Sequence, residues 1–253
     1  MLFTTSENQD YMLFNELPLE QKLLQAIAEK GYTNATPIQE KAIPPILEKR
    51  DLIGLAQTGT GKTAAFAIPI LELLHAKKPL DGGIQALIVT PTRELAIQIA
   101  DNFKAYGKHL GLRSLVIFGG VKAHAQIQTL KQKPAILIAT PGRLLDLHQQ
   151  GFVNLKQLSI FVLDEADRML DMGFIHDVKR IVKLLPRERQ TLLFSATMPN
   201  EVKNLAQSLL QDPIEVTVTP VSSTVERIDQ CMIHVADRKH KESSLVDLLK
   251  KDK

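Results

Sequence analysis

The stretch Ala56-Gln57-Thr58-Gly59-Thr60-Gly61-Lys62-Thr63 decides the fold prediction. It follows the short apolar run Leu52–Leu55 and precedes a segment with helical periodicity. A buried strand that leads through a glycine-rich turn into a helix aims several backbone N–H groups at one point. This order of elements therefore predicts a loop that binds phosphate groups at the carboxyl end of a strand.

Each residue type in this loop suits the binding of a nucleoside triphosphate. Gly59 and Gly61 allow the backbone to approach phosphate oxygens without a Cβ clash. Lys62 can reach the β and γ phosphates, and Thr63 can place its hydroxyl on Mg²⁺. The usual pattern begins with glycine, and Ala56 stands there instead. The alternative is a tight strand–helix turn with an unengaged lysine.

A second buried-strand run, Ile160–Leu163, leads directly into Asp164-Glu165-Ala166-Asp167. Carboxylates at the carboxyl end of a parallel strand lie at the crevice where α/β folds bind ligands. We assign Asp164 to Mg²⁺, through water, and Glu165 to the orientation or deprotonation of the attacking water. The predicted catalytic residues are thus Lys62, Asp164 and Glu165. The alternative is a solvated helix N-terminus, where acidic residues are favoured.

The remaining sequence alternates between strand-like and helix-like segments, without an internal repeat. Most of the apolar runs are continuous rather than alternating, as expected for strands covered on both faces. This pattern predicts an α/β fold with a mostly parallel sheet and helices on both faces. The predicted strands are Leu52–Ala56, Ala86–Thr90, Ser114–Phe118, Ala135–Ala139, Ile160–Asp164, Thr191–Phe194 and Ile214–Val218.

The pattern also predicts the domain boundaries. Residues 1–16 are expected to form a loose arm, and residues 17–218 the main domain. Residues 219–230 are polar, have no core face and are expected to form a linker. Residues 231–253 are expected to begin a second, truncated domain, with a strand at Cys231–Val235 and a helix at Lys239–Lys250.

Composition places the protein in a reducing, cytoplasmic compartment. Of the 253 residues, 44% are apolar and 23% are charged, which is ordinary for a globular chain. The lone Cys231 rules out an internal disulfide, and no apolar run has the length of a membrane span. The formal charge of +3 does not by itself indicate a nucleic-acid partner, so any binding face must come from local clustering.

Seven motifs in one order give the chain a resemblance to the DEAD-box RNA helicases, specifically to their first RecA-like domain. The resemblance covers residues 11–217, and the tail resembles the start of the second domain. It implies a RecA-like P-loop NTPase fold, with ATP and Mg²⁺ as cofactors. The motifs are Gly31–Gln39, Ala56–Thr63, Pro91–Ala96, Gly119-Gly120, Thr140–Arg143, Asp164–Asp167 and Ser195-Ala196-Thr197.

The first of these motifs resembles the adenine-recognising Q motif, which spans about residues 12–40. The carboxamide of Gln39 can pair with the exocyclic amine and N7 of adenine, a combination that guanine cannot satisfy in the same pose. Phe14 lies 17 residues before Gly31, where the family has an isolated aromatic that would stack on the base. The alternatives are a helix-surface glutamine and a packed Phe14 that fixes the arm. The predicted ATP-binding residues are Phe14, Tyr32, Gln39, Ala56, Gln57, Thr58, Gly59, Thr60, Gly61, Lys62 and Thr63.

Three other motifs follow apolar runs and are therefore expected at the same edge of the sheet, on different strands. By resemblance they bind the backbone of single-stranded RNA, which implies binding that is largely independent of base sequence. The alternative is ordinary strand–helix turns with capping threonine and glycine. The predicted RNA contacts are Pro91, Thr92, Arg93, Gly119, Gly120, Thr140, Pro141, Gly142 and Arg143.

Ser195 and Thr197 are, by resemblance, coupling residues that link the acidic motif to RNA binding through the region of Asp167. The alternative for them is a helix cap before Pro199. Met172 and Phe174, in the segment after the acidic motif, are interpreted as packing residues. Ala35 departs from the proline that many family members have, which would slightly loosen the turn.

The resemblance implies an RNA-stimulated ATPase that unwinds short duplexes or remodels RNA–protein complexes. An ATP-gated RNA clamp without productive unwinding is the alternative. The family completes its ATP site with arginines of a His-Arg-x-Gly-Arg-x-Gly-Arg motif in the second domain, and this string does not occur in the 253 residues. The chain alone is therefore expected to bind nucleotide weakly and RNA poorly, and not to unwind.

Overall fold

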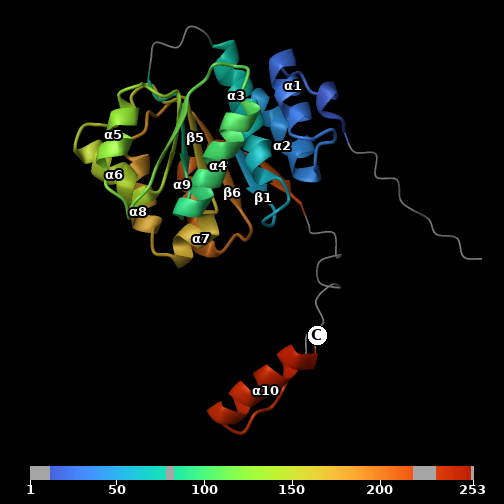
Figure 1. The fold of residues 1–253 in the computed structure, drawn as a ribbon. Helices are drawn as coiled ribbons and strands as arrows, with labels where there is room; N and C mark the ends of the chain where they lie inside the picture. Colours follow the sequence, from blue (N-terminus) through green and yellow to red (C-terminus); the bar gives the residue numbers. More distant parts are fainter. Residues whose placement is uncertain (1–11, 78–82, 219–231, 252–253) are drawn as a thin grey trace, which may run out of the picture. The chain divides into compact units, whose positions relative to one another are not determined.

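The computed structural model describes residues 12–77, 83–218 and 232–251, and the chain divides into two compact units, Met1–Thr219 and Pro220–Lys253. The first unit is built on a seven-stranded parallel sheet with the strand order β3-β4-β2-β5-β6-β1-β7. Figure 1 shows the helices packed around this sheet. All seven predicted strands and the predicted fold class are confirmed. The strands are β1 (Leu52–Leu55), β2 (Ala86–Val89), β3 (Ser114–Ile117), β4 (Ile136–Ala139), β5 (Ile160–Asp164), β6 (Gln190–Ser195) and β7 (Ile214–Thr217).

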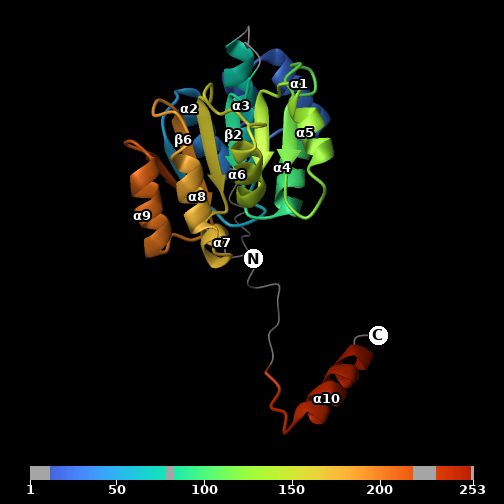
Figure 2. The same cartoon turned by 90° about the vertical axis from the view of Figure 1, so that its left-hand side faces the viewer.

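Helices cover both faces of this sheet, with α1 to α4 on one face and α6 to α9 on the other (Figure 2). The helices begin with the 3-10 turn η1 (Phe14–Glu16) and continue with α1 (Gln21–Glu29), α2 (Pro37–Leu47), α3 (Lys62–Ala76), α4 (Arg93–Tyr106), α5 (His124–Leu130), α6 (Pro141–Gln149), α7 (Ala166–Asp171), α8 (Ile175–Val182) and α9 (Asn200–Leu209).

The continuous apolar strands serve two hydrophobic cores, one on each face. In β5, Ile160 and Val162 pack with α1 to α4, whereas Phe161 and Leu163 pack with the helices of the opposite face. Alternate side chains of a strand point to opposite faces, so a strand buried on both sides must be apolar at every position. Because the strands are parallel, their carboxyl ends lie together at one edge of the sheet, between the two layers of helices.

Residues 12–16 differ from the predicted loose arm. Leu13 forms an antiparallel bridge with Asn34, and the N–H of Phe14 donates to the carbonyl of Thr33 over 3.1 Å. The Phe14 ring is only 3% exposed and belongs to the core that contains α1 to α4. Burial of this ring, together with the backbone pairing, anchors the segment. Residues 1–11 of the predicted arm lie outside the described residues.

The second unit contains one described helix, α10 (Arg238–Lys251), which confirms the helix predicted at Lys239–Lys250. The strand predicted at Cys231–Val235 is not formed over Met232–Val235, because none of the described residues pairs with this segment. A strand needs a hydrogen-bonded neighbour, and an apolar run alone does not supply one. Cys231 and the predicted linker at 219–230 lie outside the described residues.

No helix within the described ranges combines the length and the apolar character that crossing a bilayer requires.

Candidate active site

The predicted phosphate-binding loop connects the end of β1 to the start of α3, as the sequence pattern requires. Gly59 and Gly61 have φ angles of 85° and 96°, in the left-handed region that favours glycine. A Cβ on Gly61 would also lie 2.4 Å from Nε2 of Gln39, so no larger residue fits there. The absence of a Cβ therefore lets the backbone of this turn lie against the Gln39 side chain. A phosphate is expected to need an equally close approach.

Lys62 lies at the first position of α3 and is 7% exposed. Its ammonium group donates to the carbonyl of Ala56 over 2.7 Å, across the mouth of the loop. The hydroxyl of Thr60 donates to the carbonyl of Gln57 over 2.7 Å. The loop is thus held closed by its own side chains, and the lysine is preplaced where a phosphate would replace the carbonyl as its acceptor.

Asp164 ends β5 and is 4% exposed. Burial raises the pKa of this carboxyl to about 7, opposed by the positive charge of Lys62 and reinforced by the neighbouring Glu165. Its Oδ1 atom is buried without a hydrogen-bond partner among the described residues. An unpartnered carboxylate oxygen at the edge that holds Thr63 fits the donor set that Mg²⁺ prefers.

Glu165 lies between β5 and α7 in the left-handed conformation, with φ of 54°. This backbone is uncommon outside glycine, asparagine and aspartate, and such residues concentrate at functional sites. The side chain is largely buried, and its Oε2 atom accepts from Arg168 over 3.2 Å. Arg168 therefore holds the carboxylate of the predicted base in one orientation.

The three predicted coupling residues meet in one hydrogen-bonded cluster. Oδ2 of Asp167 accepts from the N–H and the hydroxyl of Thr197, over 2.8 and 2.9 Å. The backbone N–H of Asp167 donates to the hydroxyl of Ser195 over 3.1 Å. Burial tends to raise the pKa of the Asp167 carboxyl, but these hydrogen bonds outweigh burial and lower it. The cluster ties the start of α7 to the end of β6.

Gln39 connects the predicted adenine-recognition motif to the phosphate loop. Its Oε1 atom accepts from the N–H of Thr36 over 2.9 Å, and its Nε2 atom donates to the carbonyl of Gly61 over 3.1 Å. The amide is 5% exposed and forms part of a capping box at the start of α2. Each end keeps one further hydrogen-bonding position for a ligand.

The two predicted aromatic residues have different surroundings. Phe14 is packed in the core, which is the alternative that the sequence left open for it. Tyr32 is 43% exposed, and its ring centroid lies 6.3 Å from that of Tyr106. Stacking of either ring on a base remains a prediction.

Seven of the nine predicted RNA residues line one groove of about 530 Å³ at the same edge of the sheet. They are Pro91, Thr92, Arg93, Gly119, Thr140, Gly142 and Arg143. Gly120 follows Gly119 in the chain and Pro141 begins α6, but neither is among the lining residues. Parallel strands place their carboxyl ends at one edge, so residues from three separate motifs converge there.

Sequence reasoning missed four residues of this groove. Glu94 and Asp146 place two acidic side chains beside the predicted phosphate contacts, and Met172 and Phe174 form an apolar part of the wall. Met172 is 46% exposed, so its interpretation as a packing residue is wrong. No signal in the sequence separates an apolar residue that packs in the core from one that lines a groove.

Backbone caps and side-chain contacts shape the groove. The hydroxyl of Thr92 accepts from the N–H of Leu95 and caps α4, and the guanidinium of Arg93 lies 4.8 Å from the centroid of the Phe118 ring. Arg143 donates to the carbonyl of Val121 over 2.8 Å. The Arg93 side chain is exposed, whereas the Arg143 side chain is engaged in holding the loop that contains Val121.

This arrangement defines a class of protein: a P-loop nucleoside triphosphatase of the RecA-like α/β type, with a groove at the same edge of the sheet as its phosphate loop. The chain belongs to the DEAD/DEAH box helicase family, whose model matches residues 36–205.

Relatives and solved structures support this membership. The chain is 48% identical over 226 residues to the ATP-dependent RNA helicase CshA of Limosilactobacillus reuteri, covering 89% of the chain and 45% of that protein. It is 48% identical over 238 residues to the ATP-dependent rRNA helicase RRP3 of Debaryomyces hansenii, covering 93% of the chain and 49% of that protein. A DEAD box protein from Methanococcus jannaschii matches with a TM-score of 0.78 and 41% identity, over 95% of this chain and 64% of that one. The chain thus spans about half the length of the curated relatives it matches.

Proposed function

We propose that the chain is the ATP-binding part of an RNA-stimulated ATPase that unwinds short RNA duplexes or remodels RNA–protein complexes. One observation carries the proposal. The acidic motif at the end of β5 and the Ser195–Thr197 segment at the end of β6 are joined at Asp167. Strand β6 lies between β5 and β1, which leads into the phosphate-binding loop, so this contact lies between that loop and α7. Helix α7 leads to Met172 and Phe174, which line the groove. The relatives named as ATP-dependent RNA helicases support the same assignment.

In this proposal the loop residues bind the triphosphate. Lys62 exchanges its bond with the Ala56 carbonyl for a phosphate oxygen, and the N–H groups at the start of α3 bind the same phosphates. Thr63 and Asp164 would hold Mg²⁺, Asp164 through water, and the ion would neutralise charge that develops during phosphoryl transfer. Glu165, oriented by Arg168, accepts a proton from the attacking water.

The groove binds the sugar-phosphate backbone of RNA. Its predicted contacts follow β2, β3 and β4 or begin α4 and α6, and they include glycines, the threonines Thr92 and Thr140, and the cations Arg93 and Arg143. Contacts of this kind fix the strand without reading its bases. We therefore expect binding that is largely independent of sequence.

The chain covers about half of its relatives, so we further propose that a second RecA-like domain completes the ATP site. An arginine supplied by such a domain raises the rate of phosphoryl transfer by about 10³–10⁵ at related sites.

We also propose a cytoplasmic location, which rests on the single cysteine in the sequence.

The test compares Glu165→Gln and Lys62→Ala in the intact protein, with Glu201→Gln on the exposed surface of α9 as the matched control. Glu165→Gln should trap ATP and RNA together, because binding survives while the water loses its base. Lys62→Ala should lose about 2–3 kcal/mol of ATP binding, and turnover with it.

RNA-stimulated ATPase activity and strand displacement are the measurements. Unchanged turnover in Lys62→Ala would remove the assignment of the phosphate-binding loop, and unchanged turnover in Glu165→Gln would remove the assignment of Glu165 as the base. ATPase activity and RNA binding without strand displacement would favour the ATP-gated clamp instead.

A further inference from the structure

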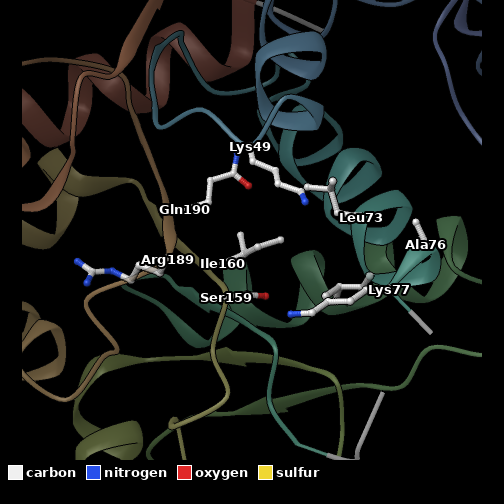
Figure 3. A pocket seen from close by; sticks show the side chains of 9 residues that line it. Lys49, Leu73, Ala76, Lys77, Ser159, Ile160, Arg189 and Gln190 are labelled. Atoms are coloured by element: carbon white, nitrogen blue, oxygen red, sulfur yellow. The ribbon is translucent and has the colours of Figure 1, made fainter. Parts of the chain in front are cut away.

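A second cavity lies at the opposite edge of the sheet from the phosphate loop. It has a volume of about 510 Å³ and is lined by the residues that start β5 and β6 and by residues at the ends of α2 and α3 (Figure 3). Helix α3 begins at Lys62 and its fifteen residues end beside this cavity, so the two sites are separated by about 22 Å of helix. The cavity is therefore distinct from the nucleotide site.

The charge of the lining is positive. Lys49, Lys77 and Arg189 contribute to it, and no acidic side chain is among the described lining residues. Figure 3 shows the ammonium groups of Lys49 and Lys77 directed into the space beside Ile160 and Ser159, whereas the guanidinium of Arg189 points away. The Lys77 ammonium group also donates to Oε1 of Gln85 over 3.3 Å, a bond that a phosphate oxygen would have to replace or share. The two lysines thus flank a region where an anion would be bound.

The polar wall also offers a fixed acceptor. Gln190 is 7% exposed, and its Nε2 atom donates to the carbonyls of Ile46 and Arg50 over 3.0 and 2.7 Å. Both amide protons are therefore used, and Oε1 is buried without a partner among the described residues. Figure 3 shows this oxygen on the same side as the Lys49 ammonium group. An unsatisfied buried acceptor is costly unless a donor reaches it, and a ligand hydroxyl would satisfy it.

Size and apolar surface narrow the class of ligand. A volume of 510 Å³ is within the range of small-molecule sites, which is about 300–1,000 Å³. Leu73, Leu74 and Ile160 supply an apolar wall. We propose that this cavity binds a phosphorylated small molecule of nucleotide size, with its phosphate on Lys49 and Lys77 and a sugar hydroxyl on Gln190.

A plainer explanation exists for the lysines alone. Lys77 is the C-cap of α3 and Lys49 follows the C-cap of α2, and cations are favourable at helix C-termini. This explanation accounts for the two charges but not for the cavity or the unpartnered Gln190 oxygen. Lys30 and Lys131 are exposed C-caps of α1 and α5 away from the cavity, so they provide a matched control.

The test titrates uridine 5′-monophosphate into the 253-residue protein and follows backbone amide resonances by NMR. We expect saturable shifts at Ser159, Ile160 and Gln190, with a Kd of about 1 mM or tighter. Lys49→Glu with Lys77→Glu should weaken this binding at least about tenfold, since charge-assisted contacts to the phosphate are lost. Lys30→Glu with Lys131→Glu should leave it unchanged.

Three results of the uridine 5′-monophosphate titration would overturn the proposal. These are shifts confined to Gly59 and Gly61, shifts that do not saturate, and equal weakening by both pairs of substitutions. Inorganic phosphate is the second probe, and it should bind at least about tenfold more weakly because it cannot use the apolar wall or Gln190. Equal affinity for the two probes would show that the cavity takes free phosphate and not a nucleotide-sized ligand.

Discussion

The carboxamide of Gln39 donates to the carbonyl of Gly61 over 3.1 Å, and this bond joins α2 to the phosphate-binding loop. The same carboxamide accepts from the N–H of Thr36, so its two ends are already oriented before a ligand arrives. An amide held in this way presents one acceptor and one donor in fixed directions. The predicted base-recognition residue and the predicted phosphate-binding loop are therefore joined by one hydrogen-bonded side chain.

Substitution of Gln39 should change the base preference of the site. In the unmodified protein ATP should bind clearly better than GTP, and Gln39→Ala should narrow the gap because adenine loses its paired donor and acceptor. Loss of the capping box should also lower the free energy of unfolding by about 1 kcal/mol. Fluorescence titration with both nucleotides is the measurement.

Gln25→Ala is the matched control, since Gln25 is exposed and its side chain donates to Glu29 on the same helix. It should leave both affinities unchanged. Equal affinity of the unmodified protein for ATP and GTP would remove the assignment of Gln39 to adenine.

Asp164→Asn should stabilise the protein in the absence of nucleotide and metal. The pKa of this buried carboxyl is raised to about 7, so the ionised form is disfavoured in the folded state. The protonated carboxyl is favoured in the folded state relative to the ionised one. This contribution to stability is complete below the unfolded pKa of about 4 and is lost as the pH rises through 7. We expect a gain of about 2 kcal/mol from the substitution at pH 8 and almost none at pH 4.

Urea unfolding followed by circular dichroism at the two pH values is the measurement for Asp164. Asp171→Asn is the control, because it makes the same substitution at an exposed residue at the end of α7. A loss of stability at pH 8 would mean that the carboxylate is favourable in the folded protein. Weaker Mg²⁺-dependent nucleotide binding should accompany the gain in stability.

Arg93→Ala should weaken RNA binding and its salt dependence together. Arg93 is exposed in the groove and stacks against Phe118, which leaves its charge available to a phosphate. Loss of one phosphate contact should lower the magnitude of the slope of log K against log salt by about 0.7 for a single strand. Fluorescence anisotropy with labelled single-stranded RNA at several salt concentrations measures this slope.

Arg187→Ala removes the same charge from an exposed turn between α8 and β6 and serves as the control. If both substitutions change the slope equally, the groove has no special role and binding reflects net charge alone. We expect the control to change the slope much less.

The sequence was sufficient for the sheet and for the convergence of the motifs. Strands buried on both faces must be apolar at nearly every position, so runs such as Ile160–Leu163 are recognisable without knowledge of their neighbours. Parallel pairing then places the ends of these runs at one edge. The positions of Lys62 and Asp164 follow from this rule.

Side-chain contacts between distant segments could not be predicted in this way. The bond from Lys62 to the Ala56 carbonyl depends on the path of the loop, and the exposure of Met172 depends on how α7 lies on the sheet. The apolar segment Met232–Val235 resembles a strand in composition, but strand formation requires a partner that composition does not reveal. These features are set by tertiary contacts and not by local pattern.

Substitutions of Phe14 and Tyr32 should distinguish an aromatic residue that packs in the core from one that stacks on the base. Phe14 is 3% exposed, so Phe14→Leu should cost about 1 kcal/mol of stability while changing ATP affinity by less than about twofold. Tyr32 is 43% exposed, so Tyr32→Ala should cost little stability but lower ATP affinity by about tenfold if its ring stacks on the base. Phe152→Leu, at another exposed aromatic, is the control. Calorimetric titration with ATP measures the affinities. A tenfold loss of ATP affinity in Phe14→Leu, with no loss in Tyr32→Ala, would assign stacking to Phe14. The Phe14 ring would then have to leave the core to reach the base.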